Sequence, residues 1–305
     1  MTKIEFAIFT KNVIKSYENL EVLKGVDLSV PTGSIFGLLG PNGSGKTTLL
    51  EIIEGIRRPD GGKVLICNFD PFEYPKEIKH LVGAQLQDTK LNSLNSVGEI
   101  LQLFSSFYSK DTNWKRVAET VKLTDHIKKL YKDLSGGQKQ LLAIGLALLG
   151  NPDVLILDEP TVGLDVNARD QIYQVIKNVK SAGKTILLTT HYLEEAEVLC
   201  DFVAILDKGE IIATGNPKSL CKSHLANDDN IIFSLSSFIA PDDISRSLNG
   251  LKIRYANGKY TTIASDIGAF SKDLSHYSTL TNNPILSINI IENKLEDVFK
   301  KLTEI

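Results

Sequence analysis

Residues 40–47 combine glycine, lysine and threonine at the spacing of a loop that binds phosphate. The run Gly40-Pro41-Asn42-Gly43-Ser44-Gly45-Lys46-Thr47 fills every fixed position of the pattern G-x-x-x-x-G-K-[ST]. Its glycines allow the backbone to curl so that N–H groups face inward at a helix start, which suits a polyphosphate. Lys46 would reach the β- and γ-phosphates, and the hydroxyl of Thr47 would bind Mg²⁺. The alternative is an ordinary glycine-rich turn. The run predicts nucleotide binding but not the process that the nucleotide drives.

Two neighbouring acids and a histidine follow apolar runs farther along the chain. Asp158 and Glu159 come directly after the run 154–157, and His191 follows the run 185–190. Buried parallel strands present ligand-binding residues at their carboxyl ends, so the three side chains are expected at one edge of a sheet. There Asp158 could hold Mg²⁺ through water, and Glu159 could polarise an attacking water. The alternatives are helix caps for the acids and an ordinary structural role for the histidine.

A second group of glycines opens a helix in the middle of the chain. The run Leu134-Ser135-Gly136-Gly137-Gln138 precedes the apolar stretch 140–149. Ser135 is a natural N-cap, and the two glycines leave backbone N–H groups bare at the helix start. The run is interpreted either as a second phosphate-binding site or as a well-capped helix, and the residues alone leave both open. Upstream, Tyr17 could stack on an adenine ring, although it also suits an ordinary strand.

Strands and helices alternate around these residues, which predicts an α/β fold. The apolar stretch 34–39 is expected to be the strand that leads into the phosphate loop, and 48–55 the helix that follows it. Between 88 and 149 strand patterns vanish, so this part is predicted to be a helical insertion. The core is expected to end near Pro217. Further strands are expected at 4–13, 28–30, 63–67 and 80–87, with a hairpin formed by 202–206 and 210–213.

The C-terminal stretch has a pattern of its own. The order β-α-β-β-α-β predicts a small ferredoxin-like domain, and Asn257-Gly258 is a residue pair typical of a two-residue hairpin turn. We therefore predict a nucleotide-binding domain at 1–220, with a helical subdomain at about 88–150, and an accessory domain at 221–305. The expected strands of the accessory domain are 231–234, 251–255, 259–264 and 285–291, and its expected helices are 242–248 and 267–277.

The composition is that of an ordinary globular protein. The chain has 305 residues, 42% hydrophobic and 23% charged, with a net charge of −3, so it carries no electrostatic footprint for nucleic acid. Its longest apolar run, 141–149, is about half of a membrane span, and residues 1–10 lack the apolar core of a signal peptide. The cysteines at 67, 200 and 221 are not in metal-binding spacing. We expect a cytoplasmic protein whose membrane role, if any, is mediated by a partner.

Taken together, the motifs resemble those of the ATP-binding cassette (ABC) ATPases. Over residues 3–217 they stand in the family's order: the phosphate loop, a strand-terminal glutamine, the Leu134–Gln138 signature, the acidic strand end and the histidine. The signature separates this family from other phosphate-loop NTPases. Gln85 and Gln87 compete for the glutamine, and the run Ser96-Val97-Gly98-Glu99 selects Gln87, because the family's glutamine precedes such a run. The resemblance implies a P-loop NTPase core with an antiparallel β subdomain and a helical subdomain.

The resemblance also implies an enzyme that hydrolyses ATP, with Mg²⁺, between two cassettes paired head to tail. Glu159 would position the water, and His191 would sense the γ-phosphate. Ser135 and Gly137 would come from the second cassette, expected to be an identical copy, and Asp165 would lie at the seam. The implied catalytic residues are Lys46, Gln87, Glu159 and His191, the implied metal ligands are Thr47, Gln87 and Asp158, and the implied nucleotide-binding residues are Tyr17, Gly40, Pro41, Asn42, Gly43, Ser44, Gly45, Lys46, Thr47, Thr48, Ser135, Gly136, Gly137 and Gln138.

The end of the chain favours one branch of the family. The run Leu295-Glu296-Asp297-Val298-Phe299 resembles the ending of cassettes that pair with ABC-2 membrane subunits in drug, antibiotic or ion efflux. The chain is therefore interpreted as the ATPase that powers export through a transmembrane permease subunit, at the inner face of the cell membrane. An importer ATPase is the closer alternative. A soluble ABC ATPase of DNA repair or translation is disfavoured because heptad runs and basic blocks are missing. One departure is Leu141, where many members have arginine.

Overall fold

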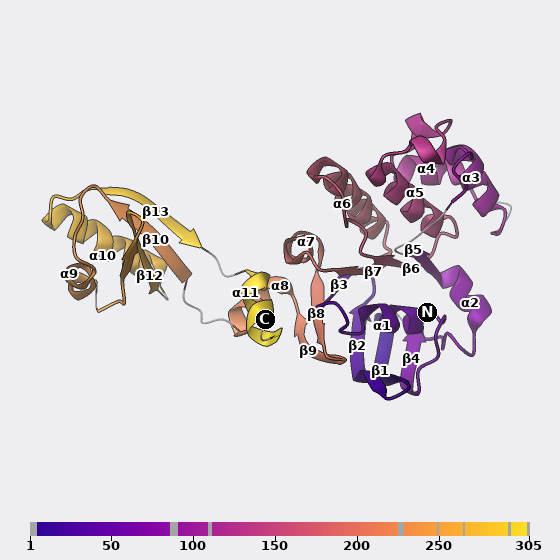
Figure 1. Ribbon diagram of the computed structural model, residues 1–305, viewed down its shortest axis with the longest axis horizontal. Coiled ribbons are helices and arrows are strands. Elements are labelled where there is room, and N and C mark those ends of the chain that lie inside the picture. The colour runs from indigo at the N-terminus through magenta and orange to yellow at the C-terminus, as the bar shows by residue number, and fades with distance from the viewer. Residues whose placement is uncertain are drawn as a thin grey trace. The chain divides into compact units, whose positions relative to one another are not determined.

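The computed structural model describes residues 5–85, 91–108, 112–224, 229–248, 250–264, 266–291 and 294–303. The expected metal ligand Gln87 lies outside these ranges. The chain divides into two compact units, Met1–Pro217 and Lys218–Ile305, and each is described by itself (Figure 1). Within the described ranges, no helix combines the length and the apolar character that crossing a membrane requires.

A six-stranded sheet forms the centre of the first unit. Its strands lie in the order β5-β6-β7-β3-β8-β9, and all neighbours are parallel except β8 and β9. Every residue of β3, β6 and β7 is buried, as expected for parallel strands that are covered on both faces. The strands are β3 (Ile35–Leu39), β5 (Val82–Gln85), β6 (Val154–Asp158), β7 (Thr185–Thr190), β8 (Phe202–Asp207) and β9 (Glu210–Gly215).

Helix α1 (Lys46–Ile53) lies between this sheet and a second, antiparallel one. The apolar side chains of α1 form a single buried cluster with side chains from both sheets. The strands of the second sheet are longer than predicted from 4–13 and 28–30, because pairing continues to a tight turn at which Tyr17 faces Leu20. In the order β2-β1-β4, they are β2 (Leu20–Pro31), β1 (Phe6–Tyr17) and β4 (Gly61–Ile66).

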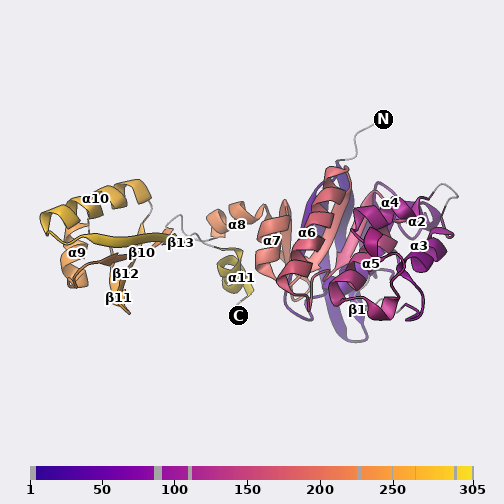
Figure 2. The same ribbon diagram turned by 90° about the horizontal axis from the view of Figure 1, so that it is seen from above.

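Three helices cover the other face of the six-stranded sheet. They are α5 (Gly136–Leu148), α6 (Val166–Ser181) and α7 (Leu193–Leu199), and Figure 1 shows them above the strands. The packing of α5 on β5 is close enough to require a glycine. A Cβ atom on Gly83 would lie 2.0 Å from the carbonyl oxygen of Ala147. Seen from above in Figure 2, α6 lies across the strands.

The described residues between β5 and β6 are helical, as the sequence predicted. Besides α5, this part contains α3 (Val97–Ser105), α4 (Trp114–Thr120) and two short 3₁₀ turns, Thr124–His126 and Tyr131–Asp133. The strand predicted at 80–87 is wrong at its start, since residues 80 and 81 belong to α2 (Pro75–Leu81). Pro75 is pre-organised for the first turn of this helix, and the helix continues to Leu81, directly before β5.

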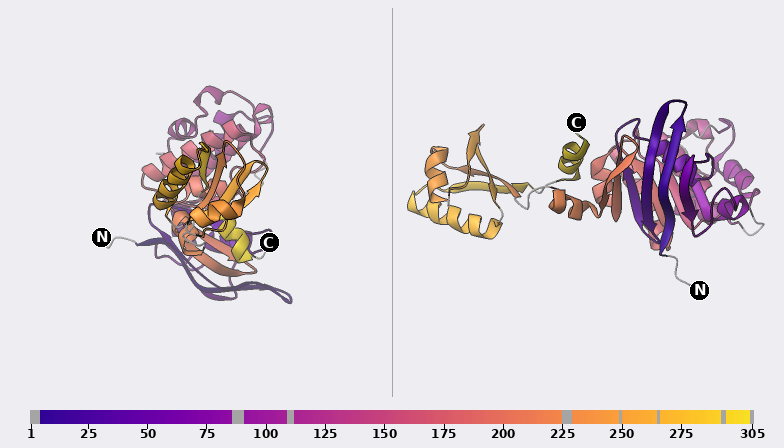
Figure 3. Two further views of the ribbon diagram at one scale, coloured as in Figure 1. Left: turned by 90° about the vertical axis from the view of Figure 1, so that its left-hand side faces the viewer. Right: turned by 90° about the horizontal axis from the view of Figure 1, so that it is seen from below.

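The second unit consists of an antiparallel sheet in the order β11-β12-β10-β13 with helices, visible in both views of Figure 3. Its own core includes Phe233, Tyr260 and Phe270, and the first two rings stack with centroids 5.1 Å apart. The strand predicted at 251–255 begins only at Arg254, because the chain before it forms the turn after α9. The elements are α8 (Pro217–His224), β10 (Asp229–Leu235), α9 (Pro241–Ser247), β11 (Arg254–Ala256), β12 (Lys259–Ala264), α10 (Ile267–Leu280), β13 (Ile285–Ile291) and α11 (Leu295–Thr303).

A chain that ends after Pro217 should fold and bind nucleotide, because each unit has its own buried cluster. The measurements are a thermal melt followed by circular dichroism and a nucleotide titration, with the full chain as control. We expect one cooperative transition and an affinity within about threefold of the control, a difference of less than 1 kcal/mol. A truncated chain that aggregates or loses nucleotide binding would show that the units depend on each other.

Candidate nucleotide-binding site

The phosphate-loop residues lie between β3 and α1, and their backbone requires glycine. Gly43 has φ 80° and Gly45 has φ 106°, a region that other residues rarely adopt. Gly40 has no room for a side chain, since a Cβ there would lie 2.2 Å from the carbonyl oxygen of Leu206. The loop therefore follows the end of β8 closely and turns directly into the first turn of the helix.

The polar groups inside this loop fit a phosphate. The side chain of Ser44 is buried, and its Oγ has no hydrogen-bond partner among the described residues. Lys46 is also buried, and its Nζ donates to the carbonyl oxygens of Gly40 at 2.8 Å and Pro41 at 3.0 Å. An ammonium group and an orphan hydroxyl at the positive end of a helix are suitable partners for an anion. Burial lowers the pKa of Lys46, while the charges of Glu159 and Asp158 raise it.

A threonine that the motif analysis did not select holds both acids. Asp158 ends β6, and the register of the parallel pair places it beside Thr189 of β7. The Thr189 hydroxyl donates to Asp158 Oδ1 at 2.5 Å and accepts from the backbone N–H of Glu159 at 2.9 Å. The sequence signal that could have identified Thr189 is its position one residue before the end of an apolar strand. Thr47 and Asp158 offer the oxygen atoms that Mg²⁺ prefers, so the residues present fit this ion.

Glu159 and His191 face each other just beyond the strand ends. Glu159 Oε1 is 3.4 Å from His191 Nδ1, and the glutamate is the less exposed of the two. Its backbone has φ 48°, a left-handed conformation that is uncommon for a residue with a side chain. The imidazole also contacts the ring of Tyr192, with centroids 4.2 Å apart. The arrangement places a carboxylate and an imidazole together at the edge of the sheet, as predicted from the sequence.

The glycine signature begins α5, and Ser135 caps this helix reciprocally. Its Oγ accepts from the N–H of Gln138 at 3.2 Å, and Gln138 Oε1 accepts from the N–H of Ser135 at 3.1 Å. Gly137 is buried, and a Cβ there would lie 2.6 Å from the Cβ of Ala168 in α6. Ser135 and Gly136 themselves are exposed. The cap is confirmed, and it leaves the first turn of α5 open on the protein surface.

Three other expected site residues, Tyr17, Thr48 and Asp165, lie on separate elements, and a fourth, Gln87, is outside the described residues. Tyr17 is 37% exposed at the end of β1, and the Arg57 guanidinium carbon is 5.1 Å from the centroid of its ring. Asp165 caps α6 by accepting from the N–H of Ala168 at 2.9 Å. Thr48 follows Thr47 in α1 and is partly buried. Gln87 lies beyond the described end of β5. The structure thus brings Lys46, Asp158, Glu159 and His191 together, and it leaves Ser135 and Gly136 of the signature exposed.

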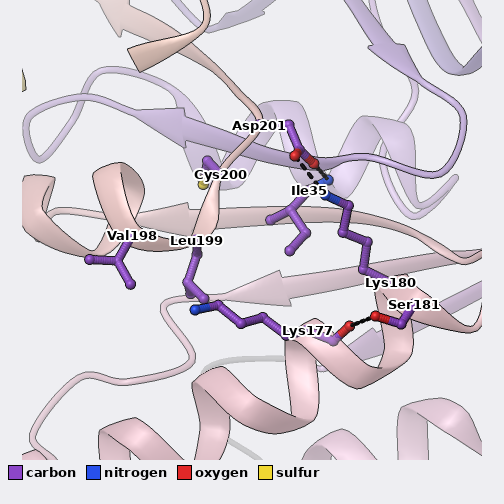
Figure 4. Close-up of a pocket in the computed structure, with 8 residues that line it drawn as sticks. All are labelled: Ile35, Lys177, Lys180, Ser181, Val198, Leu199, Cys200 and Asp201. Carbon is purple, nitrogen blue, oxygen red and sulfur yellow. Dashed lines mark hydrogen bonds and ion pairs between the residues drawn. The ribbon is translucent and has the colours of Figure 1, made fainter. Parts of the chain in front are cut away.

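The first unit also contains a pocket of about 470 Å³, which lies at the opposite ends of the strands from the phosphate loop (Figure 4). Lys180 Nζ and Asp201 Oδ1 are 2.6 Å apart there, and Asp201 Oδ2 accepts from the N–H of Ile35 at 2.8 Å. Burial raises the pKa of the neighbouring Cys200 thiol. Because Ile35 begins β3 and Asp201 precedes β8, the pocket lies at the amino ends of the strands, whereas the phosphate loop follows the carboxyl end. The lining residues are Ile35, Lys177, Lys180, Ser181, Val198, Leu199, Cys200 and Asp201.

A glycine loop between a parallel strand and a helix, with acids at the adjacent strand end, defines a phosphate-loop nucleotide-binding protein. The family model described as ABC transporter matches residues 23–162. A second model, described as an AAA domain of a putative AbiEii toxin of a type IV toxin–antitoxin system, matches residues 130–195. The two matches cover the loop, the signature, the acids and the histidine.

Similar proteins extend over nearly the whole chain. The chain is 34% identical to the Nod factor export ATP-binding protein I of Burkholderia orbicola, over 96% of this chain and 95% of that protein. It is 32% identical to the linearmycin resistance ATP-binding protein LnrL of Bacillus subtilis, over 96% and 97%. The solved dimeric structure of MJ0796, a bacterial ABC transporter cassette, matches with a TM-score of 0.61 and 31% identity, over 68% of this chain and 98% of that one. The chain therefore belongs to the ATP-binding proteins of ABC transporters.

Replacing Lys46 with alanine should weaken ATP binding and abolish turnover. The substitution removes a charge-assisted contact of about 1.5–3 kcal/mol, which corresponds to a loss of affinity of about 10- to 150-fold. Calorimetric titration with ATP and a phosphate-release assay measure the two effects. Lys63→Ala, in the exposed part of β4, is the control and should change neither. Near-normal turnover of the Lys46 variant would contradict the role of the loop.

The free energy of unfolding of the chain should fall as the pH rises, because of Glu54 at the end of α1. Burial, then the charges of Asp158 and Glu51, raise the pKa of Glu54 from 4.5 to about 7, and its Oε2 has no hydrogen-bond partner among the described residues. The folded chain therefore keeps a proton that the unfolded chain loses above pH 4.5, so unfolding becomes easier between pH 4.5 and 7. The full shift corresponds to at most about 3 kcal/mol.

Glu54→Gln should remove this pH dependence, because glutamine stays neutral. Urea unfolding at pH 5 and pH 8 measures it, with about 1–3 kcal/mol of added stability expected at pH 8 only. The control is Glu77→Gln in α2, since Glu77 is exposed and its replacement should add no stability at either pH. Equal stability of wild type and Glu54→Gln at pH 8 would show that the carboxyl is not held neutral.

Proposed function

We propose that this chain hydrolyses ATP to ADP and phosphate and thereby powers export of a substrate through a partner membrane subunit. One observation carries the proposal: Lys46, the neighbouring pair Asp158 and Glu159, and His191 come from three separate segments and meet at one edge of the sheet. The phosphate loop would hold the polyphosphate, and the adjacent strand ends would act on it. Relatives that match over the whole chain are named for export and for resistance to an antibiotic.

Each residue of the cluster has a chemical task in this reaction. Lys46 would leave the loop carbonyls and bind the β- and γ-phosphates, where its positive charge would stabilise their negative charge. Glu159 would orient and polarise the attacking water as a general base. His191, 3.4 Å from that carboxylate, would contact the γ-phosphate and respond to its presence. Thr47 and Asp158, together with Gln87, would hold Mg²⁺, which neutralises developing charge on the phosphates when bound.

A second copy of the cassette would complete each site. Ser135 and Gly136 are exposed at the start of α5, whereas Lys46 in the phosphate loop is buried. A capped helix start with bare N–H groups suits the γ-phosphate of a facing molecule. Two identical cassettes in head-to-tail orientation would satisfy both sites at once. The solved MJ0796 cassette, which is dimeric, supports the pairing of two cassettes.

The membrane side of the function would belong to a separate permease subunit. The cassette would bind it from the inner face of the cell membrane. The second unit would be an accessory domain of ferredoxin-like topology, which its strand order β11-β12-β10-β13 supports. The transported substance would be bound by the permease and not by this chain.

The test uses Glu159→Gln, which keeps the shape of the site and removes the charge that polarises water. Hydrolysis should fall by about 10²- to 10⁴-fold while ATP and Mg²⁺ still bind. ATP would remain trapped between two chains, so the variant should form a dimer with ATP on a sizing column, where the wild type is mostly monomeric. Unchanged hydrolysis would overturn the role of Glu159.

Adding Ser135→Arg tests the pairing. The arginine would place a long charged side chain at the seam, so the double variant should bind ATP as a monomer. Ser96→Arg is the matched control, because Ser96 caps α3 through the same reciprocal bonds and should leave the dimer intact. If the Ser135 double variant still dimerises with ATP, the start of α5 is not the completing half-site.

A further inference from the structure

Glu195 is a buried acid that none of the roles above uses. It lies in the first turn of α7 and is 1% exposed. Acidic side chains are almost never buried this completely without polar partners. Burial raises the pKa of this carboxyl, whereas the hydroxyls of Thr190 and Thr161 and the charge of Arg169 lower it. The group is therefore held by a specific polar environment.

Glu195 contacts the two loops that carry Glu159 and the histidine. Thr161 follows Glu159 by two residues, is 1% exposed, and donates through Oγ1 to Glu195 Oε1 at 2.9 Å. On the other side, the N–H of Glu195 donates to the carbonyl oxygen of Tyr192 at 3.0 Å. The Thr190 hydroxyl accepts from the N–H of Tyr192 at 3.0 Å. One residue thus joins the loop after β6 to the loop after β7.

Arg169 of helix α6 also contributes to the surroundings of Glu195. The guanidinium carbon of Arg169 is 4.9 Å from the ring centroid of Tyr192, and that ring contacts His191. The positive charge of Arg169 also favours the ionised form of Glu195. The imidazole and the buried carboxylate therefore belong to one packed cluster.

The backbone of Glu159 explains why such a cluster matters. Its φ of 48° is a conformation that persists only where surrounding structure imposes it. Thr189 holds the N–H of this residue from β7. The hydrogen bond from Thr161 to Glu195 holds the chain on the other side of it. Without the second contact, the loop would be free to relax and to carry the carboxylate away from His191.

We propose that Glu195 is a positioning residue for hydrolysis: through Thr161 it keeps the loop after β6 in the conformation that presents Glu159. The inference rests on the proposed function, since it assumes that Glu159 acts on water. It concerns turnover rather than binding, because the phosphate loop has its own contacts between Lys46 and the carbonyl oxygens of Gly40 and Pro41.

The test compares two substitutions of Thr161 that differ by one hydroxyl. Thr161→Val keeps the shape and removes the donor to Glu195, whereas Thr161→Ser keeps the donor. We expect kcat to fall by about 10- to 100-fold in the valine variant, with KM and the calorimetric Kd for ATP within about twofold of wild type. The serine variant should retain about half or more of kcat. Glu195→Ala should match the valine variant, and Glu197→Ala, exposed on the same helix, is the control.

Combination with Glu159→Gln separates positioning from stability. If Glu195 acts through Glu159, adding Thr161→Val to Glu159→Gln should cause no further loss of kcat. A folded Thr161→Val variant with wild-type kcat would overturn the inference, as would a further loss in the combined variant. If Glu195→Ala does not fold, the valine and serine pair carries the test alone. When Glu159→Gln abolishes hydrolysis and Thr161→Val does not slow it, only this inference fails; when Glu159→Gln leaves hydrolysis unchanged, the proposed function fails with it.

Discussion

The hydroxyl of Thr189 holds both acids of the site, and the rest of the cluster depends on this contact. It donates to Asp158 and accepts from the N–H of Glu159, so a single group on β7 sets the end of β6. The contact exists because parallel pairing places Asp158 directly beside Thr189. A one-residue slip of that register would turn the side chains to opposite faces of the sheet. The apolar burial of both strands therefore fixes the chemistry at their ends.

Charges of opposite sign lie close together in this site. Lys46 is buried near two carboxylates that favour its charged form, while burial itself disfavours it. Burial and the charges of Asp158 and Glu51 instead raise the pKa of Glu54, so its carboxyl keeps a proton to a higher pH than usual. An ammonium group in this position is well placed to bind an anion. A phosphate would supply a full negative charge, whereas the loop carbonyls supply only partial negative charges.

The exposed start of α5 bears on the proposed pairing of two cassettes, and the separate core of the second unit bears on the stability of each unit. Ser135 and Gly136 are exposed even though Gly137, next in the chain, is buried so tightly against α6 that a methyl group does not fit. The helix start is thus closely packed at Gly137 and exposed at Ser135 and Gly136, a form that suits the proposed completing half-site. The second unit has a separate aromatic core, and each unit can be stable without sharing the other's apolar residues.

The sequence by itself determined the loop, the acidic strand end, the capped α5 helix and most elements, because these depend on local spacing and on the period of apolar residues. The Asn257-Gly258 turn is one example, with φ values of 53° and 77° that only such a pair adopts readily. The sequence placed the start of β5 wrongly, because residues 80 and 81 suited a strand by local pattern but belong to the helix that begins at Pro75. Only the tertiary structure decided that Thr189 contacts both acids and that Thr161 donates to Glu195. Their contacts join segments some thirty residues apart in the chain, so no local pattern reports them. Hydrogen bonds of this kind follow from the register of neighbouring strands and from the packing of α7, and these are properties of the folded sheet.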